Sequence, residues 1–217
     1  MEGGRRVARF ISFEGGEGAG KTTQIRLLEA TLRAAGLDVG TTREPGGPPS
    51  AEAIRRLLLA DGVGQWDPLA ETMLHTAARR QHVVERIRPW LDSGKWVVSD
   101  RFADSTVAYQ GHAQGLGAKR VHCLNSLALD GLVPDLTLIL DVPVRTGLDR
   151  ARHRDGEEGA NRYERMPAEA HERLRQAFLA IAAAEPLRCV VIDADRPADA
   201  VHATVVDTIE TRLEIKL

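Results

Sequence analysis

A glycine-rich segment near the start of the chain carries the residues best suited to chemistry. It reads Gly15-Gly16-Glu17-Gly18-Ala19-Gly20-Lys21-Thr22 and matches the pattern GxxxxGK[ST]. In such a loop the backbone N–H groups converge on phosphate oxygens, the Lys reaches the β- and γ-phosphates, and the Thr hydroxyl can ligate Mg²⁺. Only four of the 29 basic residues are Lys, so chance alone would rarely place a Lys at this position of the loop. The segment predicts a phosphate-binding P-loop.

A second charged pair, Asp100-Arg101, follows Val97-Val98-Ser99. Motor-type ATPases usually carry Asp-Glu after a run of apolar residues. Guanine-specific switch GTPases carry an Asn-Lys-x-Asp run, which this chain lacks. A cation directly after the Asp favours a second anionic substrate over water as the phosphoryl acceptor.

Short apolar runs that alternate with helical patterns must position these residues. Five runs are typical of strands and end in a polar residue: 9–14, 37–43, 95–100, 136–141 and 189–193. This alternation predicts an α/β fold with a doubly wound parallel sheet and right-handed crossovers. Because ligands of such sheets bind beyond the carboxyl ends of the strands, the P-loop and Asp100-Arg101 are expected at one edge.

Apolar residues at helical spacing separate these runs. The expected helices cover residues 22–35, 51–60, 68–91, 103–129, 144–154, 168–185 and 197–213. We expect Ser50 to cap the second helix and Pro89 to break the third. The polar stretch 155–161 predicts a mobile loop.

The composition narrows the class of protein. A length of 217 residues with 43% hydrophobic content suits one α/β domain over residues 1–217. A net charge of −2 gives no general basic field for nucleic acid or a membrane surface. Cys123 and Cys189 lack the spacing of a disulfide framework or a zinc site. We therefore expect a cytoplasmic protein without nucleic-acid or membrane partners.

The chain resembles the bacterial thymidylate kinases (dTMP kinases) over nearly its whole length. The resemblance rests on motifs in the family's order, and the segments that carry it are Phe13-Glu14-Gly15 before the P-loop, Thr42-Arg43-Glu44-Pro45-Gly46-Gly47, Ala77-Ala78-Arg79, Asp100-Arg101 through Ser105 to Ala108-Tyr109-Gln110-Gly111, Pro134-Asp135-Leu136-Thr137, and Leu140-Asp141. It implies the P-loop NTPase fold of nucleoside monophosphate kinases, with a five-stranded parallel sheet and a mobile lid at about 150–165. It also implies a homodimer.

The resemblance implies transfer of the γ-phosphoryl group of ATP to dTMP, giving dTDP and ADP. ATP would be bound by the P-loop residues 15–22 together with Thr23 and Arg150. Thr22 and Asp100 would hold Mg²⁺, directly or through water. Some members carry a catalytic Arg in the P-loop and others in the lid, and Glu17 indicates the lid type here. The catalytic cations would be Lys21, Arg101, Arg154 and Arg162, with Arg162 preferred at the transition state and Arg152 a further lid candidate.

For dTMP, the resemblance assigns the phosphate to Arg101, with Arg43 nearby, and thymine O4 to Arg79. Glu17 would lie near the 3′-hydroxyl of the sugar. The remaining residues of this subsite would be Ser105 and Thr106 against the base, Tyr109 at the 2′ position, and Gln110 close by. Two positions depart from the family pattern: His75 stands where Phe often stacks on thymine, and Asn161 stands where Asp commonly precedes the lid Arg.

The reaction chemistry agrees with this assignment. A monophosphate acceptor has a second pKa near 6, so at neutral pH it is largely a dianion and needs no base.

Two alternatives stay open. One is a kinase for another monophosphate such as dUMP or dGMP, and the other is a P-loop ATPase that acts as a nucleotide-dependent binding module, for instance on DNA.

Overall fold

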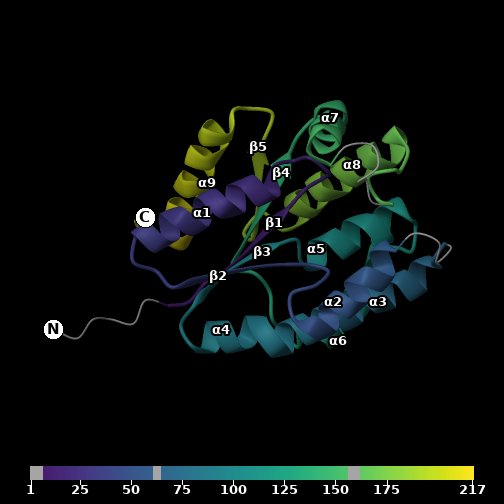
Figure 1. The fold of residues 1–217 in the computed structure, drawn as a ribbon, viewed down its shortest axis with the longest axis horizontal. Helices are drawn as coiled ribbons and strands as arrows, with labels where there is room; N and C mark the ends of the chain where they lie inside the picture. The colour runs from purple at the N-terminus through teal and green to yellow at the C-terminus, as the bar shows by residue number, and fades with distance from the viewer. Residues whose placement is uncertain (1–6, 61–64, 156–161) are drawn as a thin grey trace.

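One parallel sheet organises the chain. The computed structural model describes residues 7–60, 65–155 and 162–217. Its strands are β1 Phe10–Glu14, β2 Val39–Arg43, β3 Trp96–Asp100, β4 Leu136–Asp141 and β5 Cys189–Asp193. They run in the order β2-β3-β1-β4-β5, all parallel (Figure 1). The predicted five-stranded parallel sheet is confirmed.

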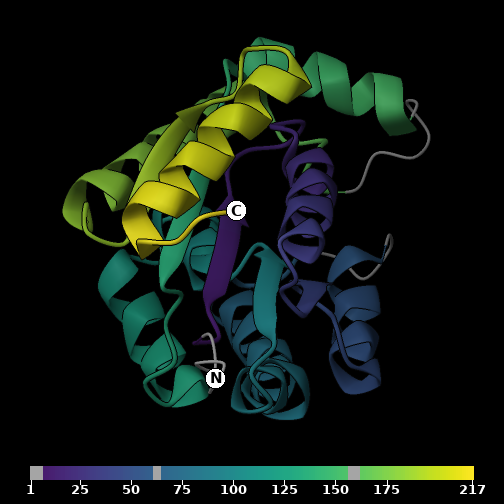
Figure 2. The same ribbon diagram turned by 90° about the vertical axis from the view of Figure 1, so that its left-hand side faces the viewer.

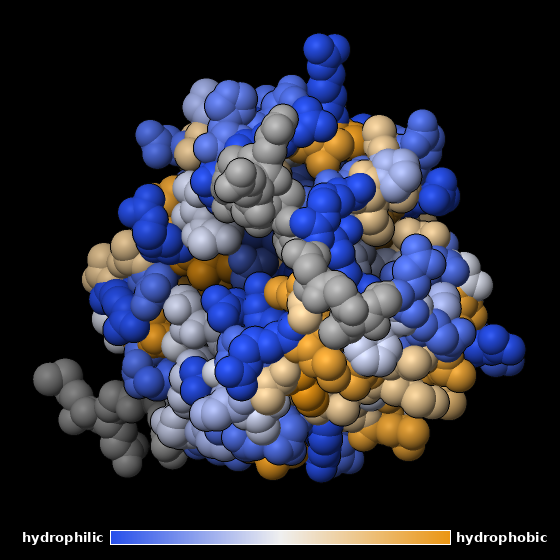
Figure 3. Space-filling model, turned by 45° about the vertical axis from the view of Figure 1, so that its right-hand side comes forward, coloured by the Kyte–Doolittle hydropathy of each residue, from blue (hydrophilic) through white to orange (hydrophobic). Residues whose placement is uncertain are grey.

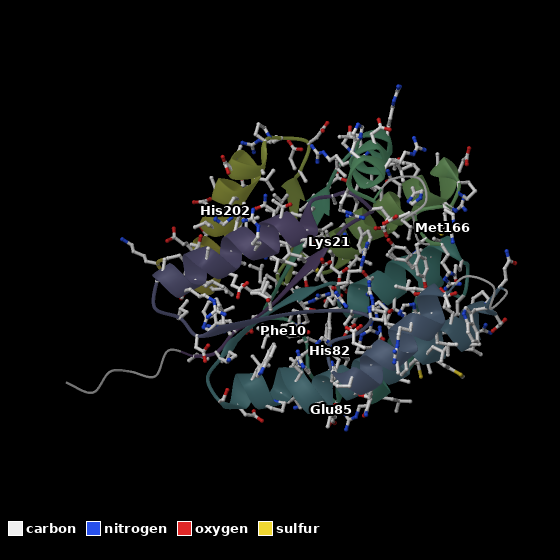
Figure 4. All side chains as sticks on the ribbon, viewed as in Figure 1. Phe10, Lys21, His82, Glu85, Met166 and His202 are labelled. Carbon is white, nitrogen blue, oxygen red and sulfur yellow. The ribbon has the colours of Figure 1, made fainter. Side chains whose placement is uncertain are left out.

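Helices cover both faces of the sheet (Figures 1 and 2). On one face lie α1 (Lys21–Ala34) and α9 (Ala198–Leu213). They are joined by a hydrogen bond between Thr31 and His202, and Figure 4 labels His202. The other elements are α2 Pro49–Leu59, α3 Pro68–His82, the π-helical segment η1 Val83–Ile87, α4 Arg88–Asp92, α5 Ala103–Thr106, the π-helical segment η2 Val107–Ala113, α6 Ala118–Leu129, α7 Val144–Asp155 and α8 Ala168–Ala184. None of the described helices is long and apolar enough to cross a membrane.

The central strand β1 is buried on both sides, as its apolar run predicts. Ile11 and Phe13 pack in the core under α1 and α9. Phe10 faces the opposite side and packs edge-on against Phe102, with ring centroids 4.9 Å apart. Burial of each such side chain contributes about 1.5–3 kcal/mol. The strand that leads into the P-loop is therefore firmly held.

Two expected helix boundaries were wrong. Ser50 is not a cap, because α2 already begins at Pro49, where the missing proline N–H costs no helical hydrogen bond. The Ser50 hydroxyl donates instead to Glu85. Pro89 does not interrupt the helical path, since it lies in the first turn of α4, directly after η1. Residues 156–161 of the expected loop lie outside the described residues.

Candidate functional site

A cavity of about 590 Å³ opens beyond the carboxyl ends of β1, β2 and β3. Figure 3 shows this hollowed face, with hydrophilic residues around much of it. Most of the expected site residues line the cavity, namely Glu17, Gly18, Ala19, Gly20, Lys21, Thr22, Thr23, Arg43, His75, Arg79, Asp100, Arg101, Ser105, Thr106, Tyr109, Gln110, Arg150 and Arg154. Gly15 and Gly16 line a small adjoining space of about 20 Å³. The strand edge thus gathers the two predicted charged regions.

Lys21 is the first residue of α1 and lies at the cavity wall (Figure 4). Its Nζ donates to the backbone oxygens of Gly15, at 3.3 Å, and Gly16, at 2.9 Å. Burial and the neighbouring charge of Arg101 lower the Lys21 pKa. Because the helix N-terminus adds its own partial positive charge, this end of the cavity is built for anionic oxygens.

Arg101 occupies the left-handed region, with φ 68°, directly after β3. Its guanidinium donates to Gly15 O at 2.9 Å, Glu17 Oε1 at 3.0 Å and Tyr109 OH at 3.1 Å. The Tyr109 hydroxyl donates to the same Glu17 oxygen at 2.7 Å. Burial raises the Glu17 pKa, but Arg101 and Lys21 more than offset this and lower the pKa to about 2. An ionised Glu17 therefore orients Arg101 inside the cavity.

Arg79 forms the inner wall and is only 2% exposed. It donates to Glu44 at 2.7 Å, to Asn125 at 2.7 Å and to Thr106 Oγ1 at 2.8 Å. Burial raises the Glu44 pKa, whereas Arg79 and the hydrogen bond from His82 lower it, with a net decrease. Four donated hydrogen bonds hold the buried guanidinium in one orientation at the cavity wall.

The lid arginines differ in where they lie. Arg150 and Arg154 line the cavity, and Arg154 pairs with Glu164 at 3.0 Å. Arg152, whose side chain is 67% exposed, pairs with Asp149. Arg162 is not among the cavity-lining residues and is ion-paired with buried Glu71. Residues 156–161 of the expected lid, Asn161 among them, lie outside the described residues.

Sequence reasoning gave no role to two residues at or beside the cavity, Glu14 and Arg55. Glu14 is fully buried and accepts from Phe102 N at 2.7 Å and Ser105 Oγ at 2.6 Å. Burial, with the charge of Asp104 adding to it, raises its pKa to about 8. Arg55 of α2 lines the cavity and donates to Pro45 O at 2.8 Å. The position of Glu14 at the end of a buried strand was the available signal.

The oxygen atoms beside the P-loop suit a magnesium ion that arrives with a nucleotide. Thr22 Oγ1 donates to Asp100 Oδ2 at 3.1 Å. Among the residues that the structure describes, no group of three or more His, Cys, Asp or Glu could hold a metal. Mg²⁺ at phosphate sites is typically bound by one or two protein oxygens plus substrate phosphates and water. A hydroxyl and one carboxylate fit that pattern.

Comparison with known proteins agrees with this geometry. A family model described as thymidylate kinase matches residues 13–205. The chain is 54% identical to the thymidylate kinase of Caulobacter vibrioides over 204 residues, which is 94% of this chain and 97% of that protein. It is 50% identical to that of Afipia carboxidovorans over 206 residues, covering 94% and 90%. The crystal structure of thymidylate kinase from Ehrlichia chaffeensis superposes with a TM-score of 0.74 at 37% identity, covering 93% of this chain and 98% of that chain. The chain belongs to the thymidylate kinase family.

Proposed function

We propose that this chain catalyses the transfer of the γ-phosphoryl group of ATP to dTMP, giving dTDP and ADP. The observation that carries the proposal is the Arg101–Glu17 ion pair, 3.0 Å long, which joins the residue after β3 to the P-loop within one cavity. Arg101 offers a forked cation for an acceptor phosphate, while Lys21 belongs to the donor side. Donor and acceptor phosphates would thus be bound in the same cavity.

The reaction needs positioning and charge neutralisation more than covalent chemistry. The acceptor dianion is itself the nucleophile, so no general base is required. Lys21 would bind β- and γ-phosphate oxygens, and the P-loop N–H groups would bind the rest of the triphosphate with Thr23 and Arg150. Mg²⁺, held by Thr22 and Asp100, would supply further neutralisation of phosphate charge when bound.

The acceptor side follows the geometry of the cavity. Arg101 and Arg43 would bind the dTMP phosphate, and Arg55, which lines the same wall, joins them as a third cation. Glu17 would accept from the 3′-hydroxyl. The base would lie against the fixed Arg79 surface, with its other neighbours drawn from His75, Ser105, Thr106, Tyr109 and Gln110.

The transition-state cation belongs to the lid segment, and two arginines are candidates. Arg154 lines the cavity, which supports its role directly. Arg162 is ion-paired with Glu71, and that pairing would have to open before Arg162 could reach a phosphate. We therefore favour Arg154 as the transition-state cation, with Arg162 as the alternative. Residues 1–217 are proposed to form a single kinase domain.

A homodimer and a cytoplasmic location remain proposals. In support of the homodimer, apolar side chains are exposed on the contacting helices α3 and α6: Leu69 at 37%, Met73 at 51% and Leu127 at 76%. Paired burial of such side chains would remove them from water. Light scattering across a dilution series would report twice the chain mass if the homodimer forms, and the mass of one chain if it does not.

The acceptor is tested by ADP release with ATP and a panel of monophosphates, namely dTMP, dUMP, dGMP and UMP. The proposal predicts a clear preference for dTMP. Equal rates with all four would favour a broad nucleoside monophosphate kinase. ATP turnover that ignores every monophosphate would favour the binding-module alternative, which the net charge of −2 does not support for DNA.

A further inference from the structure

Tyr163 lies where three parts of the cavity wall meet. Its hydroxyl donates to Glu71 Oε1 of α3 at 2.9 Å and accepts from Arg162 at 2.8 Å. His75 Nε2, also on α3, lies 3.1 Å from the same oxygen. The Tyr163 ring packs edge-on against Tyr109 of η2, with centroids 5.4 Å apart. One side chain from the segment after α7 thus contacts both α3 and η2, the two elements that would lie beside the thymine base. This part of the cavity is called the base side.

The number of protons available on each group determines the direction of these hydrogen bonds. The ionised carboxylate of Glu71 can only accept, and Arg162 can only donate. The single Tyr163 proton therefore goes to Glu71, so His75 must donate its Nε2–H. Burial lowers the His75 pKa to about 4, so the ring is neutral near pH 7. The hydrogen bond to Tyr163 then places its one ring proton on Nε2. Tyr163 thereby selects the tautomer and orientation of His75.

Glu71 holds the Tyr163 hydroxyl in this position. Its side chain is 1% exposed, and it accepts from Gln110 Nε2 at 2.6 Å and Gln114 Nε2 at 2.9 Å, besides its contacts with Arg162 and Tyr163. Burial raises the Glu71 pKa, but these donors, Arg162 first among them, more than compensate and lower it. A buried carboxylate with so many donors has one favourable arrangement, because each lost donor leaves charge uncompensated.

Glu164, the residue after Tyr163, connects this cluster to an arginine expected to act on the phosphates. Glu164 lines the cavity, and its side chain is only 7% exposed. It pairs with Arg154 of α7 at 3.0 Å. Two consecutive residues, Tyr163 and Glu164, therefore link the base side at His75 to the cavity-facing Arg154.

We propose that Tyr163 is a positioning residue, which holds Arg154 in place for phosphoryl transfer through its neighbour Glu164 while it orients His75 at the base. This inference rests on the proposed function, since the position of Arg154 matters only if transfer takes place in this cavity. Loss of the Tyr163 hydroxyl removes the hydrogen bonds to α3 but leaves the ring packed on Tyr109. The Arg162–Glu71 ion pair remains, but Glu164 and its partner Arg154 are then held less precisely, while the ATP-binding loop is untouched.

The test is a double-mutant cycle on kcat and KM with ATP and dTMP, using wild type, Tyr163→Phe, Arg154→Ala and the double variant. Tyr163→Phe is expected to lower kcat between about 10- and 100-fold, the scale of a misplaced catalytic group, with the KM for ATP nearly unchanged. In the Arg154→Ala background, Tyr163→Phe should have no further effect on kcat. Thr208→Val, which removes a hydroxyl hydrogen bond on α9, serves as the matched control and should keep wild-type kcat.

Additive losses in the cycle, or an unchanged kcat in Tyr163→Phe, would overturn the positioning role while the wild-type rate still supports the proposed function. A wild-type protein that does not phosphorylate dTMP would overturn both. If Tyr163→Phe fails to fold, Glu164→Gln weakens the other end of the same link. It should give the same kcat loss and the same absence of effect beside Arg154→Ala.

Discussion

Gly18 of the P-loop and Gly147 of α7 approach each other more closely than any side chain would allow. A Cβ atom on Gly18 would lie 1.8 Å from the carbonyl oxygen of Gly147, and Gly18 has φ 65°. In return, a Cβ on Gly147 would lie 2.5 Å from Glu17 O. The helix that carries Arg150 and Arg154 is therefore packed directly on the phosphate loop.

Replacement of Gly18 tests this packing. Gly18→Ala should push the loop and α7 apart, lowering the free energy of unfolding by about 1–3 kcal/mol and abolishing most ATP binding. Gly16→Ala is the matched control in the same loop, because a Cβ there meets nothing within 4 Å. Urea unfolding and ATP titration compare the two. Equal damage from both variants would show that the contact with Gly147 is not the reason.

Arg101→Ala tests the division of the cavity into donor and acceptor sides. The variant should raise the KM for dTMP and lower kcat, with kcat/KM reduced roughly 10²-fold or more, because a charge-assisted contact to phosphate is lost. ATP binding should stay close to that of wild type. Arg26→Ala, an exposed position on α1, is the control. A comparable loss of ATP affinity would show that Arg101 contacts the ATP phosphates and not the dTMP phosphate.

The lid arginines can be ranked by single substitutions. Arg154→Ala should lower kcat by about 10²-fold or more, because a cation near the travelling phosphoryl group is removed. Arg152→Ala is expected to be nearly neutral, since that side chain is 67% exposed and points to Asp149. Stopped-flow single-turnover rates measure the effect on chemistry directly. A large loss in Arg162→Ala with little effect in Arg154→Ala would reverse the ranking.

His75 should leave a signature in the pH dependence of stability. Its pKa is lowered to about 4 in the folded protein, against about 6.5 when unfolded. Between these values the unfolded chain binds the extra proton, so the contribution of His75 to stability is complete above pH 6.5 and is lost as the pH falls towards 4. On acidification from pH 7 to 5, wild type should lose more stability than His75→Phe. Parallel curves from urea unfolding would refute the lowered pKa.

Local sequence signals were enough for the sheet and the phosphate loop. The apolar runs at 136–141 and 189–193 coincide with β4 and β5. β4 is buried on both faces, which needs continuous apolar residues, whereas β5 lies at the edge of the sheet and leaves Val191 41% exposed. The loop pattern with its flanking strand and helix placed Lys21 at the start of α1. The failure at Ser50 came from a cap preference that Pro49 overrides.

The base side of the cavity could not be predicted in this way. The contacts of Glu71 depend on where η2 and residues 162–163 come to lie against α3, and these segments are far apart in the sequence. The site roles assigned by resemblance remain predictions. His75, one of the two departures from the family pattern, has a hydrogen-bond partner in Tyr163, which follows it by 88 positions in the sequence.

The central claim is tested most directly by following the transferred group. The purified protein would be incubated with γ-labelled ATP and dTMP, with Lys21→Ala as the inactive control, and the nucleotides separated and counted. We predict one labelled dTDP for each ADP formed, and loss of both in Lys21→Ala. ADP and free labelled phosphate without labelled dTDP would contradict the assignment of dTMP as the acceptor.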